Sequence, residues 1–425
     1  MLEVCQPHMN THALHTTCCI IGGGPAGMML GFLLARSGVQ VTVLEKHTDF
    51  FRDFRGDTIH PSTLQLLHEL DLLDHFLELP HTKVNGLCAT IGGRKFRMAD
   101  FSRLPTLAKY IALMPQWDFL NFLAHQAAAL PAFTLRMGWE ATGLLPNEEG
   151  NYAGGIAGVI ANTPDGPAHI FAQLTVGCDG RHATSRGAAH LNVVEQGVPI
   201  DVLWFCLPRQ PSDPENALGY VNFGRALILI DRHNYFQAGF IIAKDHYPEI
   251  QRRGLEAFRA SIEQLAPFLS GRTAQIDSWD NIKLLTVQIN HLERWSLPGL
   301  LCIGDAAHAM SPVGGIGINI ALQDAVAAAN ILADPLRIHS LTRHHLQQVQ
   351  DHRAPAVLRT QRIQAFAHTM LNRALQQEGP MKPPLALRLA TSIPGFQYLT
   401  GRFVGLGLQP EHIRVAPHEP QTSYH

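Results

Sequence analysis

The pattern of apolar positions predicts a β-α-β unit near the start of the chain. An apolar run over 16–21 is followed by a glycine turn, by apolar residues at helical spacing, and by a second apolar run over 39–46. Pro25 is a favourable first residue for the helix between the two runs, and Gly38 is a favourable stop. We therefore expect strand, helix and strand in that order.

Later segments alternate between apolar and polar positions with the period of a strand. The runs over 202–207, 225–230 and 235–243 predict an antiparallel sheet that could hold a small molecule. Its aromatic residues are candidates for a pocket wall: Trp204, Phe205, Phe223, Tyr235 and Phe240. Alternation places about half of such side chains on the opposite face, so plain core packing is the alternative for each of them.

Composition excludes several classes of function. The 425 residues carry 33 basic and 35 acidic side chains, a balance that does not favour nucleic-acid binding. Seven scattered cysteines without a C-x-x-C pair indicate a reduced, cytoplasmic chain with no structural metal site. We find no apolar run of membrane-spanning length and no signal peptide, so no integral membrane segment is expected.

The glycine turn has the spacing of a dinucleotide-binding motif. Gly22, Gly24 and Gly27 form a G-x-G-x-x-G pattern between strand and helix, and Glu45 follows the last of them by 18 residues. Missing side chains let the backbone turn tightly and let a pyrophosphate approach the helix amino terminus. The motif predicts a dinucleotide site without choosing between FAD and NAD.

Two further motifs follow predicted apolar strands. One strand ends at Asp179-Gly180 within 174–187, and another ends at Gly304-Asp305 within 300–332. Each aspartate alone is typical of a turn that caps a helix. In this order and spacing, the three motifs closely resemble the signature of the class A flavoprotein monooxygenases of the p-hydroxybenzoate hydroxylase type.

The resemblance implies an FAD-dependent enzyme that takes electrons from NADPH or NADH and forms a flavin hydroperoxide with O2. The expected reaction is hydroxylation or epoxidation of an aromatic or polyketide-like small molecule. The family fold is α/β, with a Rossmann-like FAD-binding domain interleaved with an antiparallel-sheet substrate domain. We expect the FAD-binding domain at 1–80, 112–190 and 281–335, the substrate domain at 81–111 and 191–280, and a helical C-terminal region at 336–425.

The resemblance also assigns site residues. Gly22, Gly24, Ala26 and Gly27 would meet the FAD pyrophosphate, and Glu45 would bind the adenosine ribose. Pro312 would shape the site where oxygen and substrate meet, without acid-base work. The other expected cofactor contacts are Lys46, Arg55, Gln116, Asp179, Asp305, Gly315, Gly317, Ile318 and Asn319. We expect Asp324 to pair structurally and His308 to support its loop. We name no catalytic base, because nothing in the sequence places His60 or His308 near a substrate.

Other functions on the same fold remain open at this point. A flavin reductase or halogenase is possible, although the W-x-W-x-I-P pattern of halogenases is absent. A non-catalytic flavin-binding scaffold protein is a further alternative. A homodimer is possible, and the amphipathic C-terminal tail could touch a membrane or a second subunit, although packing against its own FAD domain is expected.

Overall fold

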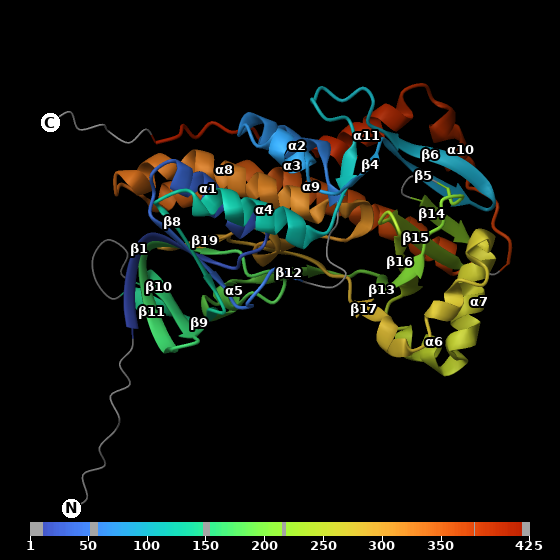
Figure 1. Cartoon of the computed structure of the whole chain (residues 1–425), viewed down its shortest axis with the longest axis horizontal. Helices are drawn as coiled ribbons and strands as arrows, with labels where there is room; N and C mark the ends of the chain where they lie inside the picture. Colours follow the sequence, from blue (N-terminus) through green and yellow to red (C-terminus); the bar gives the residue numbers. More distant parts are fainter. Residues whose placement is uncertain (1–11, 52–57, 148–153, 215–217, 378, 419–425) are drawn as a thin grey trace, which may run out of the picture.

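The first strands and helix form the predicted β-α-β unit. The computed structural model describes residues 12–51, 58–147, 154–214, 218–377 and 379–418 (Figure 1). Strand β1 (His12–Ile21) leads through the glycine turn into helix α1 (Pro25–Arg36), and β2 (Val41–Glu45) pairs parallel with β1. The Val39 amide donates to the Leu34 carbonyl at 3.0 Å, which closes the helix where Gly38 predicted its end.

The main sheet is built around these two strands. Its order is β19-β20-β11-β1-β2-β8, and the strands from β20 to β8 run parallel. Two antiparallel strands, β10 and β9, extend β11 at one corner. The bounds of the strands not yet given are β8 Phe133–Met137, β9 Glu140–Asn147, β10 Gly155–Thr163, β11 Gly166–Gly177, β19 Ser296–Leu297 and β20 Leu300–Cys302.

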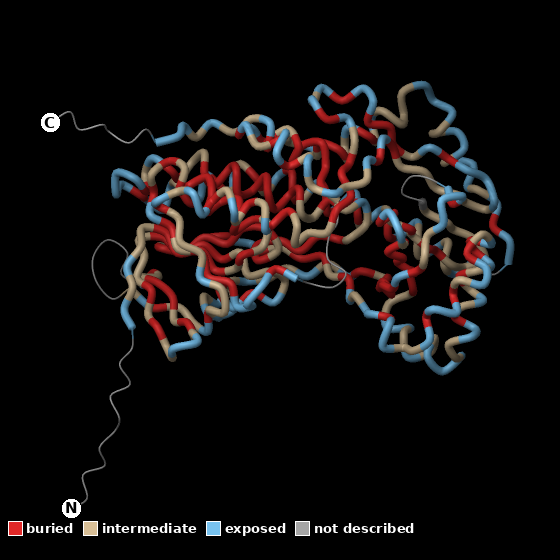
Figure 2. The backbone as a smooth tube through the Cα atoms, in the orientation of Figure 1, coloured by how far each residue is buried: buried red, intermediate tan, exposed pale blue. Residues whose placement is uncertain are grey.

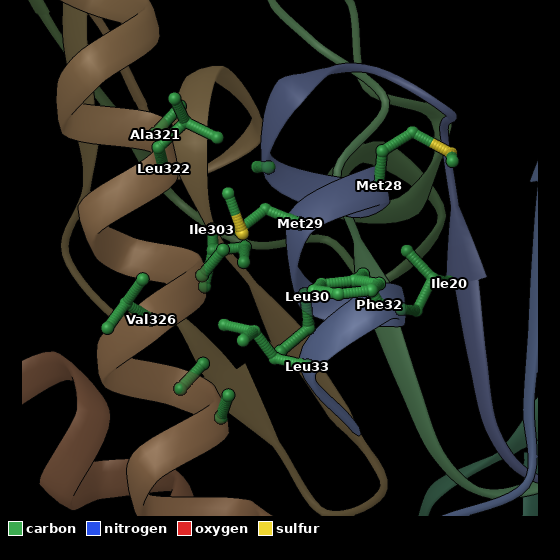
Figure 3. Packing of buried hydrophobic residues seen from close by; sticks show 14 of the residues in the cluster. Ile20, Met28, Met29, Leu30, Phe32, Leu33, Ile303, Ala321, Leu322 and Val326 are labelled. Carbon is green, nitrogen blue, oxygen red and sulfur yellow. The ribbon is translucent and has the colours of Figure 1, made fainter. Parts of the chain in front are cut away.

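Helix α1 is buried between this sheet and helix α8 (Gly317–Arg337). Met29 and Leu33 of α1 face Leu322 and Val326 of α8 in the core (Figure 3). Every residue of α1 from Ala26 to Ala35 is buried. The helix is therefore apolar all round, as expected for an element covered on both sides.

A second, seven-stranded sheet forms the other half of the molecule (Figure 1). Its order is β17-β13-β16-β15-β14-β5-β6, and the predicted antiparallel pairing holds except between β14 and β5, which run parallel. The bounds are β5 Gly86–Ile91, β6 Arg94–Asp100, β13 Ile200–Pro208, β14 Leu218–Asn222, β15 Arg225–Asp231, β16 Tyr235–Ala243 and β17 Lys283–Leu285.

The two faces of this sheet separate the predicted aromatic residues. Phe205 and Phe240 pack on Phe258 of α7 (Leu255–Leu265), with ring centroids 5.5 and 5.2 Å apart. Trp204 lies on the opposite face, in an apolar cluster that packs against Val313. Strand alternation therefore makes Phe205 and Phe240 core residues rather than pocket wall.

Short elements join the two sheets. Two three-stranded sheets have the orders β3-β7-β4 and β12-β18-β21. The remaining strands are β3 Thr58–Ile59, β4 Thr82–Val84, β7 Ile111–Leu113, β12 Val193–Gln196, β18 Ile289–Leu292 and β21 His308–Ala309. The remaining α-helices of this part of the chain are α2 Pro61–Glu69, α3 Leu73–Leu77, α4 Gln116–Ala128, α5 Thr184–Ala188 and α6 Tyr247–Arg253.

The C-terminal region is helical and wraps both halves. Helix α9 (Arg343–Leu375) passes from α8 to the second sheet, and α10 (Leu385–Ser392) and α11 (Phe396–Leu406) lie near β6. An extended tail then returns to the first half, where the His418 amide donates to the Arg36 carbonyl at 2.8 Å. The residues after α11 therefore pack on the first half, whereas α10 and α11, which carry Arg388 and Phe396, pack chiefly on β6 within the expected substrate segment 81–111.

One helix of the described chain is long and apolar enough to cross a membrane. This segment, Val313–Arg337, has a mean hydropathy of 1.5, yet 78% of its most apolar window is buried inside the fold. Ala325, Val326 and Leu332 of α8 are fully covered by the rest of the chain. The segment is therefore accounted for as a core helix.

A matched pair of glycine substitutions tests the geometry of the first turn. A Cβ at Gly27 would lie 2.0 Å from the Gly22 carbonyl oxygen, whereas a Cβ at Gly24 would have no neighbour within 4 Å. We expect Gly27→Ala to lower the free energy of unfolding of the cofactor-free protein by about 3 kcal/mol, because the backbone must shift. Gly24→Ala should change it by less than about 1 kcal/mol. Urea unfolding gives both values, and equal losses would contradict the close approach.

Candidate functional site

The three sequence motifs meet at the carboxyl ends of parallel strands. A Cβ at Gly22 would lie 2.5 Å from the Cys178 carbonyl, so the first and second motifs are in contact. A Cβ at Gly304 would lie 3.3 Å from the Cβ of Ala26, so the third motif touches the start of α1. The carboxyl edge of a parallel sheet is where nucleotides bind in α/β folds.

The glycine turn leaves room for a negatively charged ligand. Gly22 has φ +103°, a conformation that glycine adopts readily. Gly24 begins α1, no side chain caps this helix, and its first turn carries no acidic residue. The open space over Gly24 and the exposed helix dipole fit a pyrophosphate.

Glu45 lies beside this turn, at the end of β2. Its Oε2 accepts a hydrogen bond from the Gly23 amide at 3.0 Å, and its Oε1 accepts one from the His47 amide at 3.0 Å. The carboxylate is therefore fixed next to the glycine turn, where the ribose contact is predicted. Lys46 follows on the exposed surface, and its cofactor contact stays a prediction.

Asp179 is engaged with its own loop. Its carboxylate accepts hydrogen bonds from the Ser185 amide at 2.9 Å and the Ser185 hydroxyl at 2.6 Å. Burial raises the pKa of Asp179, and these hydrogen bonds oppose the rise. The side chain thus stabilises the turn into α5, which is the structural role that such an aspartate commonly has.

Asp305 connects the second and third motifs through an arginine that the sequence analysis did not single out. Arg181 Nε donates to Asp305 Oδ2 at 3.1 Å, and both side chains are partly exposed. Arg186, from the same segment, donates to the Ala306 carbonyl at 3.3 Å. Both arginines belong to the run D-G-R-x-x-x-S-R, which begins with the second motif. This closeness in sequence could have identified them as candidates for the site.

The glycine loop before α8 is held from one side by β3. Thr58 Oγ1 donates to the Gly315 carbonyl at 3.0 Å, and a Cβ at Gly315 would lie 2.3 Å from that hydroxyl. Gly314 and Gly315 have φ of +83° and +62°. Pro312 opens the loop with φ −68°, a normal value for proline.

Helix α8 begins at Gly317, with Ile318 in its first turn. No side chain caps it and its first turn has no acidic residue, so its amides can face a developing negative charge. Asn319 is buried, and its Oδ1 accepts from the His60 amide at 3.1 Å and from Thr63 Oγ1 at 2.7 Å. Its side chain therefore joins α8 to α2, which leaves its backbone for the predicted cofactor contact.

The other side of the loop is held by a buried polar stripe on α9, which the sequence analysis missed. Gln364 accepts from the Ser311 amide and donates to the Ser311 carbonyl, both at 3.2 Å. The Ser311 hydroxyl lies 2.6 Å from His368 Nε2. Gln361 donates to the Asn290 and Ala309 carbonyls at 2.8 and 3.1 Å. The helical spacing of Gln361, Gln364 and His368 was the available sequence signal.

Below the loop, Asp324 is the centre of a buried ionic network. Asp324 Oδ2 lies 2.5 Å from His308 Nε2 and accepts from the Gly304 amide at 3.1 Å. Arg353 Nε donates to Asp324 Oδ1 at 2.9 Å, and Arg353 also meets Glu411 at 3.0 Å. Burial alone raises the pKa of Asp324, but His308 and Arg353 together hold it below the usual value. The expected structural roles of Asp324 and His308 are confirmed.

Two histidines near the loop, His60 and His368, have pKa values well below the usual value for histidine. Burial lowers the pKa of His60 to about 4, while His60 Nδ1 lies 2.7 Å from the Val404 carbonyl. Burial also lowers the pKa of His368 to about 4. Both side chains are therefore uncharged at physiological pH.

Two predicted cofactor contacts, Gln116 and Arg55, have not yet been located. Gln116 is the first residue of α4, and the following Trp117 packs on Phe51 with ring centroids 4.9 Å apart. Arg55 lies outside the described residues, a short distance along the chain from Phe51. The Gln116 and Arg55 contacts stay predictions.

Comparison with known proteins agrees with this geometry. Residues 15–362 match the family model for an FAD binding domain. The chain is 30% identical to 6-methylpretetramide 4-monooxygenase of Streptomyces rimosus over 96% of both chains. Among solved structures, PqsL of Pseudomonas aeruginosa in complex with 2-aminobenzoylacetate has a TM-score of 0.72, with 21% identity, 85% of this chain and 97% of that chain covered. OxyS anhydrotetracycline hydroxylase of S. rimosus has a TM-score of 0.71, with 22% identity and coverage of 94% and 77%.

The chain belongs to this FAD-binding family, the p-hydroxybenzoate hydroxylase type of class A flavoprotein monooxygenases. It is an FAD-dependent monooxygenase, and FAD is its cofactor. The residues at the site fit the cofactor, because the open glycine turn and the uncapped starts of α1 and α8 suit its phosphates and its reduced ring.

A bulky residue at the open position of the turn tests the placement of the pyrophosphate. We expect Gly24→Val to fold, because its side chain meets open space, but to raise the Kd for FAD at least about 100-fold by filling the phosphate position. Flavin content after purification and FAD titration by fluorescence measure this. Gly197→Val is the control, because a Cβ there also has no neighbour within 4 Å and Gly197 lies outside the three motifs. A Gly24→Val protein with full flavin content would refute the placement.

Removal of Arg353 tests the ionic network. Arg353→Met leaves Asp324 buried without its arginine, and we expect the free energy of unfolding to fall by about 3 to 5 kcal/mol. Arg359→Met, at an exposed position of the same helix, should cost less than about 1 kcal/mol. Thermal and urea unfolding measure both variants, and an Arg353→Met protein as stable as its control would show that the network contributes nothing.

Proposed function

We propose that the protein uses NADPH or NADH and O2 to hydroxylate, or epoxidise, an aromatic, polyketide-like small molecule. The relative at 30% identity is named for such a reaction and aligns over almost the whole chain. When bound, FAD supplies the oxygen chemistry, and the protein supplies position and electrostatics. We also propose that the enzyme works in the cytoplasm. The homodimer is a separate prediction, which light scattering tests.

We place the substrate between the 311–315 loop and the face of the second sheet that carries Trp204. The supporting observation is the cluster on this face, in which Trp204, Val202 and Ile241 pack with Val313 of the loop. The division into FAD-binding pieces 1–80, 112–190 and 281–335 and a substrate domain at 81–111 and 191–280 is part of this proposal. The sheet pairing crosses these boundaries in two places. Strand β4 of the substrate segment pairs with β7, at the start of the second FAD-binding piece, and β17 of the third FAD-binding piece joins the second sheet.

Trp204 offers a hydrogen-bond donor on this face that could recognise an oxygen of the substrate. The indole is 8% exposed, and its Nε1 has no hydrogen-bond partner among the described residues. Gly239 makes space for the ring, since a Cβ there would lie 3.0 Å from it. A buried donor without a partner costs free energy, and an oxygen of an aromatic substrate would satisfy it.

The proposed chemistry predicts substrate-stimulated reduction of the flavin. We expect a yellow protein whose anaerobic bleaching by NADPH or NADH accelerates at least about tenfold with one member of a panel of phenols and fused-ring aromatics. Admission of 18O2 should then give a product with one labelled oxygen. Absence of bleaching would favour the scaffold protein, product reduced without oxygen would favour a reductase, and a halide requirement would favour a halogenase.

The variant Trp204→Phe separates the proposed hydrogen bond from ring packing. It should raise the KM of the oxygen-bearing substrate about tenfold and leave flavin content and unstimulated reduction unchanged. An unchanged KM would remove Trp204 from substrate recognition without affecting the assignment as a monooxygenase.

A further inference from the structure

Helix α10 stands at the periphery of the second half with no buried residue (Figures 1 and 2). Leu385 and Leu389 are 65% and 60% exposed, and Ile393, directly after the helix, is 60% exposed. The three residues are four positions apart, so they lie along one side of the helix. An apolar stripe without cover is unusual for a helix this far from the core.

Helix α10 is nevertheless held firmly to the sheet. The Met381 amide, just before it, donates to Asn222 Oδ1 at 2.8 Å, and a Cβ at Gly92 would lie 2.0 Å from the Met381 carbonyl. After it, a Cβ at Gly401 of α11 would lie 2.1 Å from the Asp100 carbonyl. The apolar stripe is therefore presented on a fixed platform.

The neighbouring elements extend the same surface. Leu399 of α11 is 70% exposed, and Arg103, in the loop after β6, stacks on Tyr398 of α11 with its guanidinium 4.0 Å from the ring centroid. The Thr400 hydroxyl donates to the Met98 carbonyl of β6. We call this set, comprising residues 94–109 and 379–407, the α10 surface.

The α10 surface is strongly basic, although the whole chain has a net charge of −2. All of its basic side chains are exposed: Arg94, Lys95, Arg97, Arg103, Lys109, Lys382, Arg388 and Arg402. Asp100 is the one carboxylate in these two segments; it is 3% exposed and pairs with Arg97 at 3.0 Å. Exposed leucine and isoleucine together with exposed arginine and lysine is the composition of a helix that lies in a lipid interface.

We propose that the α10 surface docks the enzyme on an anionic lipid membrane. Leu385, Leu389 and Ile393 enter the headgroup region, and the basic side chains meet lipid phosphates. A second copy of the chain is a poorer occupant, because two such surfaces would bring like charges together. A fluid lipid surface also fits a protruding helix without a matching groove. The docking is peripheral, and the core helix α8 takes no part in it.

Flotation of the FAD-loaded protein with lipid vesicles tests this proposal. We expect the protein to float with vesicles of about 30% phosphatidylglycerol in phosphatidylcholine, and to stay behind with pure phosphatidylcholine. Salt at about 0.5 M should release most of it, because the charges are exposed. Failure to float with the anionic vesicles at low salt would overturn the proposal.

Substitutions distinguish binding through the α10 surface from non-specific binding to vesicles. Leu385→Ser/Leu389→Ser and Arg388→Glu/Arg402→Glu should each weaken vesicle binding at least about tenfold, with thermal midpoint and flavin content unchanged. Ile338→Ser is the control, because Ile338 is 63% exposed at the end of α8, outside the α10 surface. The proposal would be overturned if all three variants bound the vesicles equally well. It would also be overturned if light scattering showed the unsubstituted protein to be a dimer and Leu385→Ser/Leu389→Ser to be a monomer.

Discussion

The buried contact of Asp324 with His308 and Arg353 is the interaction on which the rest of the site depends. It joins the third motif, the core helix α8, the long helix α9 and, through Glu411, the C-terminal tail. A carboxylate with 0% exposure persists only when cations and amides compensate for the lost water, and the Gly304 amide completes that set. The position of the Gly304-Asp305 turn is therefore coupled to the packing of residues more than 100 positions later.

Helix α9 supports the loop of the cofactor site through hydrogen bonds. The amide, carbonyl and hydroxyl of Ser311 all bond to Gln364 or His368, so the loop that Pro312 opens is shaped from behind by this helix. Thr58 fixes the opposite end of the loop at Gly315. A glycine-rich loop pays heavily in conformational entropy when it is ordered, and these bonds offset that cost. The enzyme thus holds flexible backbone in one shape with rigid neighbours.

The sequence by itself determined the local architecture and the family. Strand, turn and helix around Gly22, Gly24 and Gly27 follow from apolar periodicity and from the need for bare backbone at a phosphate. The strand ends of the second and third motifs and the strands around Trp204 were found at their predicted places. Such features depend on neighbours within a few residues, which is why they can be recognised in a linear pattern.

Only the tertiary structure decided which side chains share a face and which polar groups pair. Alternation along β13 and β16 was visible, but the covering of Phe205 and Phe240 by α7, and of Trp204 by the loop at Val313, required the packed sheet. The partners of Asp305, Asp324 and Ser311 come from Arg181, Arg353 and His368. Hydrogen bonds and ion pairs act over about 3 Å in space, at any separation in sequence, so a single chain pattern does not encode them visibly.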